Sequence, residues 1–101
     1  MGIFKNFLSY NEDESKQVLK LMYHQDGGHG WIEVPKFIAT WLELNGKISN
    51  YSYEDNESYF LEEDCDAGVL FNSIPDGVTL ECENVYYDGM CYIRDLPRVH
   101  S

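Results

Sequence analysis

The chain has 101 residues, enough for one hydrophobic core, so we expect a single domain over 1–101 with a possible N-terminal arm at 1–15. Its formal net charge is −11, from 18 Asp and Glu against 7 Lys and Arg. Such a charge repels DNA, RNA and anionic membranes and attracts basic surfaces, so we expect no direct contact with nucleic acid or membrane. Hydrophobic residues make up 44% of the chain, which excludes a disordered composition.

The cysteines and the start of the chain indicate its compartment. Cys65, Cys82 and Cys91 are an odd number, and no two have CxxC spacing. The start MGIFKNFLSYNEDE shows no signal-peptide pattern, and no apolar run approaches the length of a transmembrane helix. We therefore expect a cytoplasmic protein with reduced thiols.

The first predicted unit is a hairpin followed by a helix. KQVLKLMYH (16–24) predicts a strand, GWIEV (30–34) predicts its partner, and the glycines of QDGGHG suit the turn between them. Residues 1–15 precede this hairpin as a short helix or a loosely packed arm. Pro35 fits the first helical position, and Asn45–Gly46 is a helix stop. The apolar face of the helix consists of Phe37, Ile38, Trp41 and Leu42.

The second unit repeats this order, and a last hairpin follows it. ISNYSYE (48–54) and SYFLE (58–62) predict strands, and Asp64 is the predicted cap of a helix that ends at Pro75–Asp76–Gly77. VTLECENVYY (78–87) and MCYIRDL (90–96), joined by Asp88–Gly89, predict a hairpin. The apolar face of the second helix is Ala67, Leu70, Phe71 and Ile74. The expected fold is α+β: a single domain in the order ββα–ββα–ββ, with an antiparallel sheet and two helices on one face.

The loop within HQDGGHGWIEVP (24–35) allows three interpretations. As a metal site, His24, His29 and Asp26 would supply ligands, completed by the carboxylates or the thiol of residues 62–65, although the spacing matches no standard zinc pattern. As a turn, it would be anchored on the core by Trp31, with its histidines solvated or bonded to backbone carbonyls. As a recognition loop, its histidine and tryptophan would contact a partner. The turn is the preferred interpretation, and we expect no metal and no cofactor.

The acids of LEEDCDA (61–67) are also ambiguous. Paired carboxylates can act as general acid and base or bind magnesium, and acids at a helix start can cap free amides. Four acids in five residues exceed what capping requires, and a partner's Arg or Lys could neutralise them. The carboxylates around Cys65 would raise the pKa of its thiol, which disfavours a nucleophilic cysteine.

The segments HQDGGHGWIEVP, ISNYSY and YFLEEDCDA resemble, in this order, a family of small phage- and plasmid-encoded proteins with HxDxGHGW and LEEDCDA motifs. The resemblance covers about residues 21–72, whereas residues 1–15 and 75–101 depart from the pattern. It implies a phage or plasmid origin, and it implies that the two motifs form one site. It implies no particular activity.

Together these features predict an inhibitor without catalytic residues. A small acidic phage or plasmid protein could bind the basic nucleic-acid-binding surface of a host defence protein by nucleic-acid mimicry, in an anti-CRISPR or anti-restriction manner. One alternative is a metal-dependent or acid–base enzyme that uses His24, His29 and residues 62–66. Another is a non-catalytic adaptor. The predicted binding residues are Glu54, Asp55, Glu57, Glu62, Glu63, Asp64, Asp66, His29 and Trp31.

Overall fold

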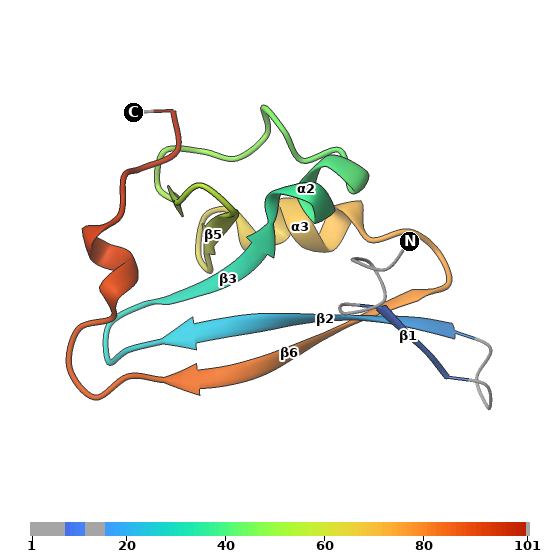
Figure 1. Ribbon diagram of the computed structural model, residues 1–101, viewed down its shortest axis with the longest axis horizontal. Coiled ribbons are helices and arrows are strands. Elements are labelled where there is room, and N and C mark those ends of the chain that lie inside the picture. Colours follow the sequence, from blue (N-terminus) through green and yellow to red (C-terminus); the bar gives the residue numbers. More distant parts are fainter. Residues whose placement is uncertain (1–7, 12–15, 101) are drawn as a thin grey trace.

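The computed structural model describes residues 8–11 and 16–100 as a single α+β domain (Figure 1). Its strands form one six-stranded sheet. The elements are β1 (Leu8–Asn11), β2 (Lys16–Gln25), β3 (Gly30–Pro35), α2 (Lys36–Trp41), β4 (Tyr53–Glu54), β5 (Ser58–Glu62), α3 (Ala67–Ser73), β6 (Val78–Tyr86) and the 3-10 helix η1 (Tyr92–Asp95). Within the described residues, no helix is long and apolar enough to cross a membrane.

Strand β2 is the centre of the sheet. It pairs antiparallel with β1 and β3, and β5 continues the sheet from β3 to β4. It also pairs in parallel with β6 over residues 17–25. Because β6 occupies one edge of β2 along this length, β1 and β3 share the other edge, with β1 beside its start and β3 beside its end. Among the described strands, β6 is therefore an edge strand.

The two helices cover one face of this sheet (Figure 1). Alternate residues of each strand point to the same face, and those that face the helices are apolar. The buried core on this face includes Leu19, Leu21, Ile32, Val34, Leu61, Ile38, Ala39, Ala67 and Leu70. Each large side chain here stabilises the fold by about 1.5–3 kcal/mol through burial. The prediction of an α+β domain with two helices on one face is confirmed.

A second, smaller core lies on the opposite face. Trp31 of β3 and Phe60 of β5 pack there against Cys91 and Ile93 of the C-terminal segment, which we define as residues 87–100. The backbone N–H of Tyr87 donates to Gln25 of β2 (2.8 Å), and the backbone N–H of Glu54 in β4 donates to Pro97 (2.9 Å), so this segment is attached to the sheet near both of its ends. The C-terminal segment thus covers part of the sheet face that lies opposite the two helices.

The structure corrects the predicted pairing of the last hairpin. Residues 90–96 were expected to form a strand beside residues 78–87, but they form a loop and η1. Burial of Cys91 and Ile93 against Trp31 and Phe60 favours this path over pairing with β6. The sheet is consequently mixed, not purely antiparallel, because the partner of β6 is the parallel strand β2.

Other predicted boundaries also change. The strand expected over 48–54 is reduced to Tyr53–Glu54, and the first helix begins at Lys36, after Pro35. Of the predicted apolar helix faces, Trp41 and Phe71 are exposed. The N-terminal segment contains the strand Leu8–Asn11 in place of a helix or loose arm there, and the rest of that prediction lies outside the described residues.

Candidate functional site

The turn between β2 and β3 is organised by the carboxylate of Asp26. Its Oδ1 accepts hydrogen bonds from the backbone N–H groups of Gly28 (3.0 Å) and His29 (3.1 Å). The same carboxylate accepts two bonds from the Arg94 guanidinium at 2.7 Å each and one from the backbone N–H of Cys91 at 3.0 Å. The hydrogen bonds from Arg94 and then from Cys91 hold the pKa of the Asp26 carboxyl well below its usual range. This turn is therefore fixed to the C-terminal segment.

The turn lies beside the end of β5, where a pocket opens. Antiparallel pairing sets Trp31 opposite Glu62, and the backbone N–H of Glu63 donates to the Gly30 carbonyl at 3.0 Å. The pocket has a volume of about 300 Å³. Its lining residues are His29, Trp31, Tyr51, Tyr53, Glu62, Asp64, Cys65, Arg94 and Arg98. The two motifs of the sequence therefore meet at one pocket.

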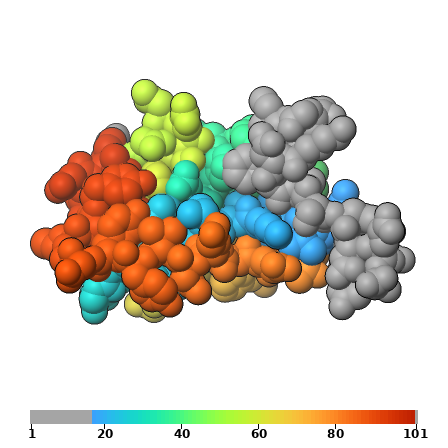
Figure 2. Space-filling model, turned by 60° about the horizontal axis from the view of Figure 1, so that its bottom comes forward, coloured from blue at the N-terminus to red at the C-terminus, as the bar shows by residue number. Residues whose placement is uncertain are grey.

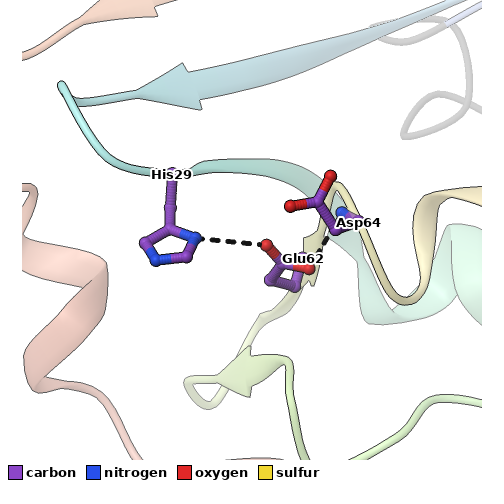
Figure 3. Close-up of side chains that lie close together, drawn as sticks. All are labelled: His29, Glu62 and Asp64. Atoms are coloured by element: carbon purple, nitrogen blue, oxygen red, sulfur yellow. Dashed lines mark hydrogen bonds and ion pairs between the residues drawn. The ribbon is translucent and has the colours of Figure 1, made fainter.

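Three side chains in this pocket can ligate a metal. The Nδ1 atom of His29 lies 3.4 Å from Oε1 of Glu62, and the ligand atoms of His29, Glu62 and Asp64 all lie within 4.8 Å of one another. Figure 3 shows the imidazole and the Glu62 carboxylate pointing toward each other, with Asp64 beside them. His29 and Asp64 are exposed, whereas Glu62 is buried. We define these three residues as the His29 trio.

Glu62 is the fixed member of the trio. Its Oε2 accepts a hydrogen bond from the backbone N–H of Asp64 at 2.8 Å, and its own backbone N–H donates to Ser52 Oγ at 2.9 Å. The Ser52 hydroxyl donates in turn to the buried carboxylate of Asp66. A carboxylate held in this way reaches the pocket in one orientation.

Trp31 forms the floor beneath the turn, as the sequence predicted. Its side chain is only 2% exposed, and the Arg94 guanidinium lies over its ring at 5.2 Å from the centroid. The indole N–H is buried and has no hydrogen-bond acceptor among the described residues. A buried donor without a partner costs about 1–3 kcal/mol, so this group is unusual.

The thiol of Cys65 is poorly suited to nucleophilic chemistry. Although Cys65 is exposed, partial loss of its hydration is the first cause that raises its pKa, followed by a hydrogen bond to Glu62 and by the negative charges of Glu62, Asp66 and Asp64. The sequence had predicted the contribution of the carboxylates. The partial desolvation depends on the tertiary structure.

His24 lies apart from the His29 trio. It is buried, and its Nε2 lies 2.8 Å from Glu33 Oε1 and its Nδ1 lies 2.8 Å from the Tyr87 hydroxyl, both within hydrogen-bond distance. Glu33 also accepts a hydrogen bond from Ser58 Oγ at 3.2 Å. The expectation that His24 is solvated or bonds a backbone carbonyl is therefore wrong, because the C-terminal segment covers it.

The seven acids predicted to form a binding face do not form one exposed surface. Glu62 and Asp66 are buried, and Glu54 forms an ion pair with Lys36 at 2.7 Å. Asp55 accepts hydrogen bonds from two backbone N–H groups in the turn before β5. The exposed members of the set are Glu57, Glu63 and Asp64. Four of these seven carboxylates are therefore either buried or bonded to other groups of the protein.

The predicted helix cap is also displaced. The residue at the N-cap of α3 is Asp66, not Asp64, and its side chain makes no cap hydrogen bond. Its carboxylate instead accepts hydrogen bonds from the backbone N–H and the hydroxyl of Ser49 and from the hydroxyl of Ser52. Asp66 therefore ties the loop after α2 to the start of α3.

Other acids are exposed on β6 and on the segments before and after it, and β6 runs as a band across the face that Figure 2 shows. Among the described residues none of these acids has an ion pair. We name the set the β6 acidic surface: Asp76, Glu81, Glu83, Asp88 and Asp95. The predicted binding set omitted these residues, although the lack of any basic residue between Lys47 and Arg94 was a signal for all of them except Asp95, which follows Arg94.

Comparison with protein-family models, with curated proteins and with solved structures finds no match to this chain.

Proposed function

We propose that this chain is a non-enzymatic inhibitor that binds a host defence protein at its basic nucleic-acid-binding surface. It would act in the cytoplasm of the host cell, in an anti-CRISPR or anti-restriction manner, as a phage or plasmid product. The observation that carries this proposal is the β6 acidic surface, whose five exposed carboxylates have no ion pair among the described residues.

The distribution of charge supports this function. Lys36 and Arg94 form ion pairs with Glu54 and Asp26, so they compensate acids other than those of the β6 acidic surface. Partner Arg and Lys side chains can supply the missing positive charge. Electrostatic attraction of this kind accelerates association and selects basic partners.

Large apolar side chains beside these acids could anchor a partner. Tyr86 is 75% exposed and Met90 is 77% exposed, and Tyr92 of η1 is also exposed. Exposed aromatic side chains with a polar rim are typical of residues that contribute most to binding energy. The same run of chain thus offers both anchors and charges.

The spacing of the acids on β6 suits nucleic-acid mimicry. Glu81 and Glu83 are two residues apart on one strand, so they share a face and lie about 6.7 Å apart along it. This separation is about twice the 3.4 Å rise per phosphate along one DNA strand. Charges on an edge strand also oppose pairing with a second strand, which leaves their side chains available to a partner.

The test is a competition assay with purified DNA-binding defence enzymes, namely a restriction endonuclease and an RNA-guided nuclease. We expect the protein to displace a fluorescent duplex from its target, as measured by anisotropy, with a steep loss of potency as salt rises. The E81K/E83K variant should lose displacement, and E81Q/E83Q should retain part of it.

The matched control is E43K/E57K, which reverses two exposed acids outside the β6 acidic surface. It changes the net charge by the same amount as E81K/E83K. Equal loss in both variants would show that net charge alone matters, and displacement that is insensitive to E81K/E83K would contradict a role for β6.

A further inference from the structure

We propose that the His29 trio binds one divalent transition-metal ion, with zinc preferred, and that the ion keeps a coordination position open to the pocket. His29, Glu62 and Asp64 would supply one nitrogen and two oxygen ligands. This site is separate from the β6 acidic surface, so it stands or fails independently of the proposed inhibitor function.

The first argument is the distance between His29 Nδ1 and Glu62 Oε1. It is 3.4 Å, longer than the usual range of a nitrogen–oxygen hydrogen bond. Two ligands at about 2.0–2.1 Å from one tetrahedral zinc ion are about 3.4 Å apart, because the angle between them is near 109°. The pair is therefore spaced as two ligands of one ion.

The second argument is that the protein holds the ligands together before any ion binds. Asp26 fixes the backbone of His29, and the Asp64 backbone fixes the carboxylate of Glu62. The pairing of Trp31 with Glu62 joins the two elements that carry them. Such preorganisation lowers the entropy cost of binding a metal. The remaining ligand, Asp64, is exposed and needs only a side-chain rotation to adjust its distance.

The third argument is the pocket that the trio lines, which has a volume of about 300 Å³. Three protein ligands leave zinc with a position for a water or for an oxygen of a small anion, as in catalytic zinc sites. A pocket of this volume has room for such a ligand beside the trio.

The ligand set also selects the class of ion. Magnesium and calcium prefer six or more oxygen ligands, whereas a histidine nitrogen with two carboxylates suits zinc and neighbouring transition metals. Cys65 lines the same pocket, so its thiol is the natural competitor for the fourth position. We expect the His29 trio to bind the ion without the Cys65 thiol.

The experiment is a zinc titration of the full chain against a chromophoric chelator at pH 7.5, after treatment with EDTA and a reductant. We expect one equivalent to bind. H29Q and D64N should weaken binding at least tenfold, and C65S should retain it. Cobalt bound to the wild type should give the intense visible absorption of a tetrahedral site.

The matched controls are H100Q and E63Q. His100 is an exposed histidine, and Glu63 is the exposed neighbour of Glu62, and neither belongs to the trio. Both variants should bind zinc as the wild type does, and so should E81K/E83K, which separates this site from the inhibitor function. Unchanged binding in H29Q, or equal affinity for magnesium, would overturn the proposal, as would loss of binding in C65S alone. Circular dichroism would verify that each variant is folded.

Discussion

Replacing Asp66 by alanine should destabilise the fold strongly. The side chain is only 3% exposed, and its carboxylate accepts hydrogen bonds from Ser49 and from the fully buried Ser52. Hydrogen bonds to a charged group contribute about 1.5–3 kcal/mol each, so the loss of the bonds to two residues should cost about 3–6 kcal/mol. This is a large fraction of the roughly 5–15 kcal/mol that stabilises a typical domain.

The variants D66N and D64A give two smaller expected changes in stability with which D66A can be compared. Asparagine keeps an oxygen at the position of Oδ2, which faces both serines, so D66N should cost about 1 kcal/mol. Asp64 is exposed and is not the cap of α3, so D64A should change stability by less than about 0.5 kcal/mol. A true N-cap would cost about 1 kcal/mol on replacement by alanine.

The assay is urea unfolding at pH 7 in EDTA, followed by tryptophan fluorescence and by circular dichroism. With a denaturant slope of about 1.5 kcal/mol per molar, D66A should lower the midpoint by about 2 M or more. A double-mutant cycle with S52A should be clearly non-additive, because the two side chains share one hydrogen bond. A D66A variant within about 1 kcal/mol of the wild type would refute the structural role of this carboxylate.

Three further predictions concern acids and thiols elsewhere. Because Arg94 lowers the folded-state pKa of Asp26, this carboxylate stabilises the fold above about pH 4 and loses that effect as the pH falls further. The free energy of unfolding should therefore fall less steeply with pH in D26N than in the wild type. Equal steepness in the two proteins would contradict this role of Asp26. The thiol of Cys65 should react slowly with iodoacetamide at pH 7, and faster in E62Q, whereas an unchanged rate would exclude Glu62 as a cause of the raised pKa. In thermal melts D55K should lower Tm, since Asp55 bonds two backbone amides, while E57K should not; the reverse order would contradict the assignment.

Local patterns in the sequence predicted much of the secondary structure. The alternation in 16–24 and 30–34 predicted β2 and β3, and the glycines between them predicted their turn, because side-chain period and turn geometry are properties of neighbouring residues. The strand at 58–62 and the amphipathic helix that begins at Ala67 were also predicted. The anchoring of the turn by the apolar Trp31 followed from the same reasoning.

The tertiary structure alone decided how the last strand pairs. A local turn signal at Asp88–Gly89 predicted a hairpin, yet β6 pairs in parallel with β2, about 60 residues earlier in the chain. Partner and direction of a strand depend on where the rest of the chain packs, and the C-terminal segment packs over Trp31 and Phe60. No local pattern carries that information.

The same distinction applies to the candidate site. The sequence identified His29, Glu62 and Asp64 as candidates, among others, for one metal site, but their separation of more than 30 residues left their spacing open. The register of β3 with β5 brings the three side chains together. His24 lies on β2 and contacts Glu33 and Tyr87 instead. Burial also decides which acids are internal, as for Glu62 and Asp66, and which are exposed, as on β6. Composition sets the net charge, whereas packing decides which charges face the solvent, because a carboxylate can enter the protein only where donors surround it.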